Sequence, residues 1–390
     1  MDDALNPYTP GSGLAPTVLT GRDRDLQAFD NLIKRAENSL LGRPMLLIGL
    51  RGVGKTVLLN QLKSRADKCD WLTVKVEASQ GVRGAESVRR AIANGLGKAS
   101  LRYRAKALVK ESALALSRAV ASFHLSLGDG AMNLGVETKD LAPVTGNLEL
   151  DLQDVTSAVA ETLKRDRKAL AFFIDEMQDL DEEMMEALIS AQHEAGQNRL
   201  PFYIIGAGLP SLPGKVARSR SYAERMFEVH TIDRLGLHSA RKALSAPAER
   251  QDVEFENDAL DFLAEASGQY PYFLQEFGSQ IWKVGEISPF TIADARQAAR
   301  LGTKQLDAGF FQARWDRATP AERDYLSAMA ALGDGSAETK EIGERLGKDN
   351  KALGPVRAKL INKGLIYSPE HGKVRYTVPN FKEFIIRRSE

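Results

Sequence analysis

The stretch Met45-Leu46-Leu47-Ile48-Gly49-Leu50-Arg51-Gly52-Val53-Gly54-Lys55-Thr56 decides the fold of this 390-residue chain. Its first four residues are all apolar, which is typical of a strand buried on both faces of a parallel sheet. The next eight fit G-x-x-x-x-G-K-[ST], in which glycines let backbone N–H groups turn inward around phosphate oxygens at the positive end of a helix. The sequence therefore predicts a phosphate-binding loop between a strand and a helix at 56–66.

The loop and the first turn of that helix supply candidate ligands. The Lys55 ammonium group would contact the β- and γ-phosphates of a nucleotide, and the Thr56 hydroxyl would ligate Mg²⁺. The full set of predicted nucleotide contacts in this stretch is Gly49, Gly52, Val53, Gly54, Lys55, Thr56 and Val57.

A second motif is acidic and lies far along the chain. Phe172-Phe173-Ile174-Asp175-Glu176 is an apolar strand that ends in two carboxylates. Asp175 is placed to hold Mg²⁺ through water, and Glu176 to polarise the water that attacks a phosphate. Taken alone, the pair could be two solvated acids at a helix start. Together with the phosphate-binding loop it favours a catalytic site.

Hydrophobic patterning predicts an α/β fold with a parallel sheet. Strands are expected at 45–48, 71–76, 169–174 and 201–205, and the helices between them serve as crossovers. Four further helices are expected at 239–250, 256–267, 271–284 and 291–306. Phe123-His124-Leu125-Ser126-Leu127, before Gly128-Asp129-Gly130, is read as the start of a hairpin. We predict a core at 1–235 with a polar N-terminal arm at 1–20, a helical lid domain at 236–312 and a third domain at 313–390.

The third domain is predicted to be a winged helix. Helices at 319–332, 339–346 and 349–363 precede two strands, 365–367 and 374–378, that a wing joins. Residues 319–350 hold four basic and seven acidic side chains, whereas residues 351–390 hold nine basic and three acidic ones. The predicted contacts to DNA are Lys351, Arg357, Lys359, Lys363, Lys373 and Arg375. The alternative is a winged helix that serves protein contacts or domain packing.

Composition excludes several classes of protein. With 43% hydrophobic residues, 27% charged residues and a net charge of +1, the chain reads as globular, and any basic surface must be local. The single cysteine, Cys69, excludes an intrachain disulfide and suits a reducing compartment. No apolar run approaches the roughly 20 residues of a membrane span, and no signal peptide is visible. We expect a cytoplasmic protein without a membrane partner and with no metal beyond nucleotide-bound Mg²⁺.

These features resemble the AAA+ ATPases of the STAND and origin-recognition clades. The resemblance rests on Val18-Leu19-Thr20-Gly21-Arg22-Asp23, the phosphate-binding loop, the Asp-Glu strand and the helical domain, and it covers nearly the whole chain. It implies ATP and ADP as ligands with Mg²⁺, and nucleotide-dependent self-association. It also implies that Gly21 and Arg22 help to seat the nucleotide, although a helix-entry turn would explain them as well.

The same resemblance implies an arginine that reaches the γ-phosphate in a neighbouring subunit. Arg225 is the first candidate and Arg220 the second, and Arg218 lies in the same segment. Such an arginine neutralises charge on the transferring phosphoryl group.

Two departures from the family pattern predict slow turnover. The strand Ile204-Ile205-Gly206-Ala207-Gly208 ends without a polar side chain, and the lid motif Gly268-Gln269-Tyr270-Pro271 has proline where many relatives have arginine. A proline there resembles STAND switches, in which it packs near the adenine, so Pro271 is a candidate contact. Fewer polar contacts at the γ-phosphate weaken stabilisation of the transition state.

The leading hypothesis is an ATP-binding and slowly hydrolysing switch that associates with duplex DNA through its winged helix. The alternative is a signalling or defence STAND ATPase in which the winged helix is an autoinhibitory or protein-interaction module. A transcription regulator with a vestigial ATP site is disfavoured, because Lys55 and Glu176 are both present.

Overall fold

The computed structural model describes residues 1–11, 13–106, 110–126, 145–333 and 335–389. The chain divides into two compact units, which we describe separately. The sheet unit consists of Asp23–Ile48 and Lys55–Thr231. The helical unit consists of Met1–Arg22, Gly49–Gly54 and Ile232–Glu390. The phosphate-binding loop is thus a short segment of the helical unit that connects two elements of the sheet unit.

The sheet unit is built on five parallel strands in the order β2-β3-β4-β1-β5. The strands are β1 (Met45–Ile48), β2 (Leu72–Glu77), β3 (Leu170–Asp175), β4 (Phe202–Gly208) and β5 (Glu228–Thr231). Every residue of β3 and β4 is buried, because helices cover both faces of the sheet. The predicted parallel α/β fold is confirmed, and β5 is a strand that the sequence did not reveal.

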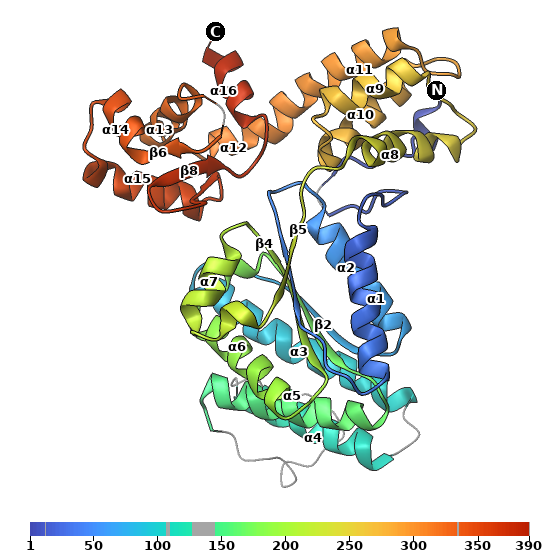
Figure 1. Ribbon diagram of the computed structural model, residues 1–390, viewed down its shortest axis with the longest axis vertical. Helices are drawn as coiled ribbons and strands as arrows, with labels where there is room; N and C mark the ends of the chain where they lie inside the picture. The colour runs from blue at the N-terminus through green and yellow to red at the C-terminus, as the bar shows by residue number, and fades with distance from the viewer. Residues whose placement is uncertain (12, 107–109, 127–144, 334, 390) are drawn as a thin grey trace. The chain divides into compact units, whose positions relative to one another are not determined.

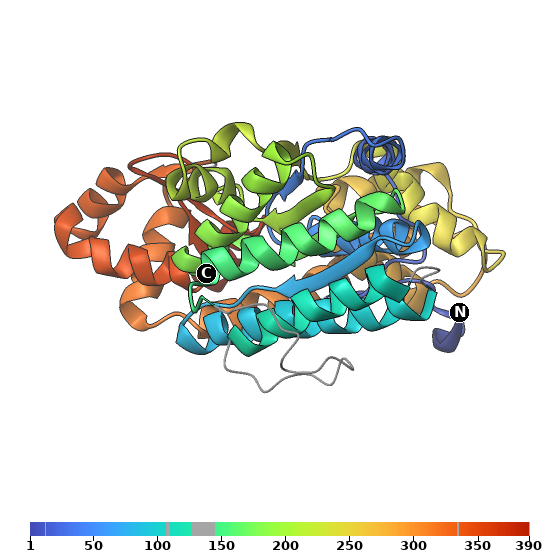
Figure 2. The ribbon, with the colours of Figure 1, turned by 90° about the horizontal axis from the view of Figure 1, so that it is seen from below.

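Helices cover the two faces of the sheet unequally (Figure 1). On one face lie α1 (Asp23–Glu37) and α2 (Lys55–Lys68), and Phe29 of α1 packs edge-on against Phe173 of β3. On the other face lie α3 (Val82–Lys106), α5 (Leu148–Arg165) and α6 (Glu182–Gln197), and α4 (Lys110–Ser126) packs between α3 and α5 (Figure 2). A shorter helix, α7 (Leu212–Ser219), packs on α6.

The predicted hairpin near residue 123 is wrong where the structure describes it. Residues 123–126 are the last turn of α4. Leu116, Val120 and Phe123 recur at helical spacing, and all three are buried in the core of the sheet unit. This burial outweighs the alternating pattern of the short segment. Gly128-Asp129-Gly130 lies outside the described residues.

The helical unit begins its main array after β5. Its helices are α8 (Leu237–Glu249), α9 (Asn257–Ala266), α10 (Pro271–Val284) and α11 (Ile292–Gln305), followed by a π-helical turn (Leu306–Phe311) and α12 (Gln312–Asp316). The four helices predicted for the lid agree with α8 to α11.

The N-terminal arm, predicted only as a polar segment, is docked on α10. Tyr8 is buried and donates its hydroxyl hydrogen to the carbonyl of Leu244, and the Trp282 indole donates to the carbonyl of Asp2 at 2.7 Å. Gly278 permits this docking, because a Cβ there would lie 2.4 Å from the Tyr8 ring. The arm is therefore part of the core of the helical unit.

The C-terminal part of the helical unit combines helices with a small antiparallel sheet. Its helices are α13 (Pro320–Ala330), α14 (Thr339–Leu346), α15 (Asn350–Asn362) and α16 (Phe381–Ser389). Its strands are β6 (Ala337–Glu338), β7 (Ile366–Tyr367) and β8 (Lys373–Tyr376), in the order β6-β8-β7. The predicted helices and hairpin are present, and β6 and α16 are additional. Phe381 and Phe384 of α16 stack on Phe311, which fastens α16 to the π-helical turn.

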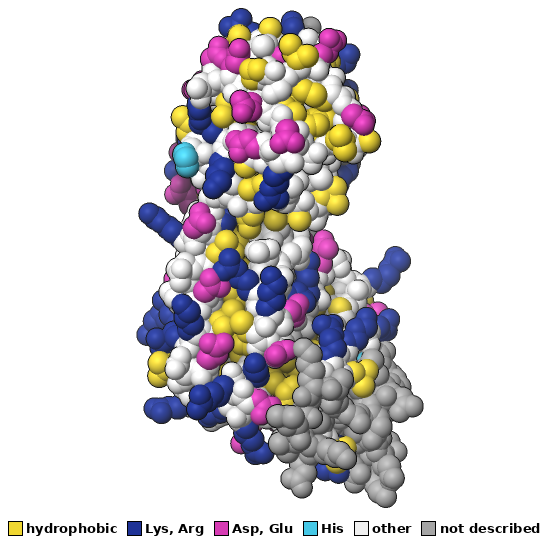
Figure 3. All heavy atoms as spheres, turned by 90° about the vertical axis from the view of Figure 1, so that its right-hand side faces the viewer, with side chains coloured by type: hydrophobic (Ala, Val, Ile, Leu, Met, Phe, Trp, Pro, Cys, Tyr) yellow, Lys and Arg dark blue, Asp and Glu magenta, His cyan; other side chains and the backbone are white. Residues whose placement is uncertain are grey.

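One face of the molecule shows side chains of both charges (Figure 3). On the face shown in Figure 3, lysine and arginine side chains are interspersed with aspartate and glutamate, as the net charge of +1 suggests. None of the described helices is long and apolar enough to cross a membrane.

Candidate functional site

The loop Gly49–Gly54 leaves β1 and enters α2 at Lys55. Gly52 and Gly54 have φ angles of +87° and +92°, in the left-handed region that favours glycine. At Gly49, a Cβ would lie 2.0 Å from the carbonyl oxygen of Ile232. Glycine is therefore required at all three positions. The result is a backbone turn at a helix N-terminus, where N–H groups and the helix dipole favour an anion.

The side chains at the start of α2 fit a bound nucleotide. Lys55 is the first residue of the helix and only 6% exposed. The positive end of a helix stabilises anions, so a buried ammonium group at this position suits a site that receives a phosphate. Thr56 follows in the first turn, with its hydroxyl available as an Mg²⁺ ligand.

The acidic residues lie at the same edge of the sheet as the loop. Gly206 of β4 pairs with Ile174 of β3 on one side and with Leu46 of β1 on the other. Asp175, which ends β3, therefore reaches the edge at which β1 leads into the loop. Asp175 is 4% exposed, and its Oδ1 accepts the backbone N–H of Glu176 at 3.0 Å. A carboxylate oxygen in this position is the kind of ligand that Mg²⁺ prefers.

Glu176 is held by a residue that the sequence analysis missed. The Glu176 backbone is left-handed, with φ of +48°, and its Oε2 accepts a hydrogen bond from Gln178 Nε2 at 2.6 Å. Gln178 Oε1 in turn accepts the backbone N–H of Leu209, just after β4, at 3.0 Å. Gln178 therefore supplies a polar group at the strand end that carries none of its own. The only signal in the sequence is its place two residues after Glu176.

The turn that carries Gln178 is fastened from α7. Lys215 donates to the backbone carbonyl of Gln178 at 2.8 Å and also to the carbonyl of Leu180. Burial lowers the pKa of Lys215. The carboxylate of Glu176 thus stands on a rigid support rather than on a free loop.

Arg22 and Tyr270, the residue before Pro271, contact the loop within the helical unit. Arg22 is 8% exposed and donates to the carbonyl oxygens of Val53 at 2.9 Å and Asp233 at 2.7 Å, so it braces the loop from behind. Gly21, before it, has φ of +67°. Pro271 begins α10, and the preceding Tyr270 lies against Gly52.

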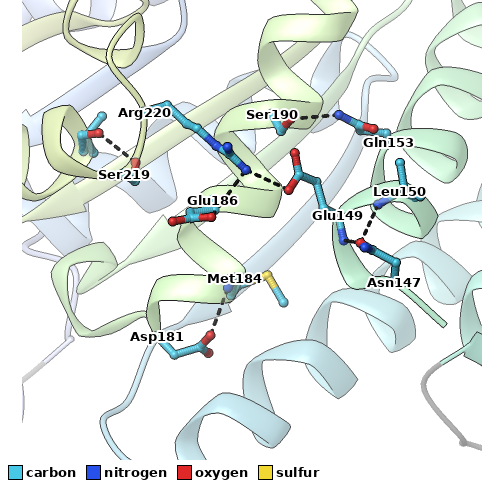
Figure 4. A network of polar contacts seen from close by, with 11 residues as sticks. Asn147, Glu149, Leu150, Gln153, Asp181, Met184, Glu186, Ser190, Ser219 and Arg220 are labelled. Atoms are coloured by element: carbon cyan, nitrogen blue, oxygen red, sulfur yellow. Dashed lines mark hydrogen bonds and ion pairs between the residues drawn. The ribbon is translucent and has the colours of Figure 1, made fainter.

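The three arginines of the 218–225 segment differ in their surroundings, and Figure 4 shows the contacts of Arg220. Arg220 pairs with Glu149 of α5 at 2.8 Å and with Glu186 of α6 at 3.3 Å. It therefore holds the end of α7 against two helices of its own subunit. Arg218 and Arg225 are exposed.

The six basic residues predicted to meet DNA do not form one free surface. Lys351, Lys359 and Arg375 are exposed, and Lys373 pairs with Glu370 at 3.0 Å. Lys363 pairs at 2.6 Å with Glu322, whose side chain is 1% exposed. Although burial opposes ionisation of Glu322, hydrogen bonds from Lys363 and Thr319 hold its pKa below the ordinary value. Lys363 therefore has a structural contact.

The parallel sheet, the glycine loop and the acidic strand end together define a P-loop AAA fold. Residues 18–205 match the family model described as an AAA ATPase domain, which supports ATP hydrolysis as the activity. Residues 308–385 match a family described as a domain of unknown function (DUF8462).

Several solved structures are similar to this chain at low sequence identity. A Walker-type ATPase of Pyrococcus abyssi is 14% identical with a TM-score of 0.61, over 98% of this chain and 99% of that chain. The RuvB Holliday junction branch migration motor of Thermotoga maritima is 14% identical with a TM-score of 0.47, over 93% and 95%. The ORC1 protein of Aeropyrum pernix, solved in complex with DNA, is 15% identical with a TM-score of 0.46, over 96% and 94%. No curated protein matches the chain.

We predict that Gln178→Leu lowers the kcat of ATP hydrolysis by about 10²-fold and leaves KM unchanged, because Glu176 loses its support while the loop stays intact. Steady-state phosphate release measures both constants. Gln80→Leu is the matched control, since Gln80 Nε2 donates to Asp179 in the same turn at 2.7 Å. An unchanged kcat in Gln178→Leu would contradict the positioning role.

Proposed function

We propose that the chain is an ATP-binding and slowly hydrolysing switch. The observation that carries this proposal is the arrival of the loop and of Asp175–Glu176 at one edge of the sheet. Backbone N–H groups of residues 49–57 and Lys55 bind the phosphates of ATP or ADP, and Thr56 and Asp175 hold Mg²⁺. Bound Mg²⁺ neutralises phosphate charge. Glu176 accepts the proton of the attacking water.

The domain division that we propose is a core at 1–235, a lid at 236–312 and a winged helix at 313–390, with the N-terminal arm of the first domain packed on the lid helices. Turnover is slow because neither the end of β4 nor the Gly268–Pro271 motif offers a charged side chain that would stabilise the transition state at the γ-phosphate. Self-association would complete the site through Arg225. The pairing of Arg220 within its own subunit supports Arg225 over Arg220, because Arg225 is exposed. Pro271, at the start of α10, would pack near the adenine.

We predict that Lys55→Ala abolishes ATP binding, because the phosphate charge loses its buried partner. Glu176→Gln keeps binding and loses hydrolysis, because only activation of water is removed. Calorimetric titration with ATP and a phosphate-release assay separate the two effects. Wild-type turnover in Glu176→Gln would remove this residue from the mechanism, and wild-type affinity in Lys55→Ala would refute the site.

The C-terminal domain is the part of the chain that would bind duplex DNA. Three helices followed by the β7–β8 hairpin fit a winged helix, in which the third helix and the wing face DNA. Lys351 and Lys359 on α15 and Arg375 on β8 are exposed, and Arg357 is half-buried on the same helix. Contacts of this kind are made mainly to phosphates, so affinity would fall steeply with salt.

We predict that Lys359→Ala weakens binding of the full chain to a duplex and lowers the slope of log K against log salt by about one. Fluorescence anisotropy over a salt series measures the slope. Lys304→Ala on α11 is the control, because it removes an exposed lysine outside the domain. Equal slopes for both variants would argue against α15 as the DNA-binding element.

A second candidate function is restraint of the ATP site by the C-terminal domain. The backbone N–H of Arg51, in the phosphate-binding loop, donates to the carbonyl of Thr377 at 3.1 Å. The Arg51 guanidinium also lies against Gly364, where a Cβ would be 2.9 Å from it. A loop engaged in this way by another domain is less free to close around phosphates. A partner that draws the domain away would then release the site.

The restraint hypothesis predicts that Gly364→Ala raises the rate of ATP hydrolysis, because the new Cβ displaces Arg51. Gly347→Ala is a matched control, since its φ of +62° is close to the +64° of Gly364 and no atom lies within 4 Å of its Cβ position. Both changes cost a similar backbone strain of about 1 kcal/mol. A phosphate-release assay in which both variants behave alike would exclude restraint through this contact.

A further inference from the structure

Arg314, on α12, is a half-buried cation among other cations. Its guanidinium carbon lies 3.7 Å from the centre of the Phe310 ring, and Nη1 donates to the Phe310 carbonyl at 2.7 Å. Its charged neighbours are Arg51 of the phosphate-binding loop and Arg317. No ion pair within the described part of the chain joins Arg314 to a carboxylate. Burial, followed by the charge of Arg51, lowers the pKa of Arg314 to about 10. Even a half-buried guanidinium in such surroundings is costly unless an anion joins it.

Tyr270 presents a second polar group to the same loop. It is 4% exposed, and its hydroxyl has no hydrogen-bond partner among the residues that the structure describes. A Cβ on Gly52 would lie 2.8 Å from a carbon of the Tyr270 ring and 3.3 Å from its hydroxyl oxygen. Burial raises the pKa of Tyr270, so the hydroxyl stays protonated and can donate. A buried donor without an acceptor costs free energy that a ligand oxygen would recover.

One aromatic cluster holds both side chains. Tyr272 stacks on Phe310 with ring centroids 4.7 Å apart, and Phe273 lies 5.0 Å from Tyr270 and 5.9 Å from Phe310. This cluster joins α10 to the π-helical turn and α12. Tyr270 and Arg314 are therefore positioned before any ligand arrives, which lowers the entropic cost of binding.

We propose that Tyr270 and Arg314 bind the terminal phosphate of the nucleotide that the loop holds, in the same subunit. The inference rests on the proposed ATP binding. The N–H groups of a P-loop surround the α- and β-phosphates next to the helix start, so groups that meet the loop at Arg51 and Gly52 face the outer phosphate. That phosphate carries negative charge that ADP lacks, and it would lie beside the cationic Arg314.

This assignment replaces the contact that the Gly268–Pro271 motif does not supply. The cation comes instead from α12, which precedes α13 and the C-terminal domain directly in the chain. Loss of the terminal phosphate would remove an anion from beside Arg314, whose charged neighbours in the structure are Arg51 and Arg317. Exchange of ATP for ADP would thus change the charge next to α12, the helix that leads into the C-terminal domain.

Calorimetric titration of the full chain with ADP and with AMPPNP, both with Mg²⁺, tests the proposal. We expect Arg314→Gln to weaken AMPPNP binding roughly 10- to 100-fold and to leave ADP affinity within about twofold, as expected for a lost charge-assisted hydrogen bond. Tyr270→Phe should weaken AMPPNP roughly fivefold. The matched controls are Arg317→Gln and Tyr272→Phe, which should bind both nucleotides as the wild type does.

Thermal unfolding without nucleotide separates a ligand contact from a structural one. Arg314→Gln should leave Tm unchanged or raise it, because a buried charge beside Arg51 is removed. Equal loss of AMPPNP and ADP affinity, or a lowered Tm, would show that Arg314 is structural and would overturn the proposal. Wild-type protein that binds ADP and AMPPNP, together with variants that bind both equally well, would overturn it and leave the proposed function standing. Wild-type protein that binds neither nucleotide would overturn the proposed function itself.

Discussion

The close approach of backbone to backbone at Gly49 is the constraint on which the rest of the site depends. A side chain there would meet the Ile232 carbonyl at 2.0 Å, so only glycine lets β1 pass into the loop beside the start of the lid. Gly52 then turns the loop toward Tyr270 with a φ of +87°. Because these positions tolerate no side chain, segments far apart in the sequence meet at a six-residue loop.

The phosphate-binding loop therefore contacts several segments of the chain in addition to forming the proposed ligand site. Arg22 holds the Val53 carbonyl, and Thr377 accepts the Arg51 N–H. Each such hydrogen bond contributes only about 1 kcal/mol. A ligand that binds one arrangement of the loop and its neighbours a few kcal/mol more tightly than another is therefore enough to shift the equilibrium between the two. The terminal phosphate, if bound by Tyr270 and Arg314, supplies a difference of that size. Nucleotide chemistry and the position of the C-terminal domain are then coupled through one short loop.

The parts of the structure that the sequence predicted are those fixed by local pattern. The phosphate-binding loop, the acidic strand end and the helices α8 to α11 follow from spacing within about 20 residues. The docking of Tyr8 under α10 does not, because its partner Gly278 lies far away in the chain and reads as an ordinary glycine. The contacts of Gln178 and Arg314 were missed for the same reason. Each depends on which backbone group or cation the fold brings next to it.

The number of basic residues in the sequence likewise does not show which of them form ion pairs in the structure. The excess of basic side chains over residues 351–390 treats each lysine and arginine as free to meet a phosphate. In the structure Lys363 pairs with buried Glu322, Lys373 with Glu370, and Arg387 with Asp307. A paired cation releases fewer counterions on binding DNA, because its field is already neutralised. If α15 and the hairpin bind DNA, the salt dependence should therefore reflect about three or four phosphate contacts from Lys351, Arg357, Lys359 and Arg375 rather than the full formal excess. The strength of any DNA contact thus depends on which acidic residues the fold places beside each lysine or arginine side chain.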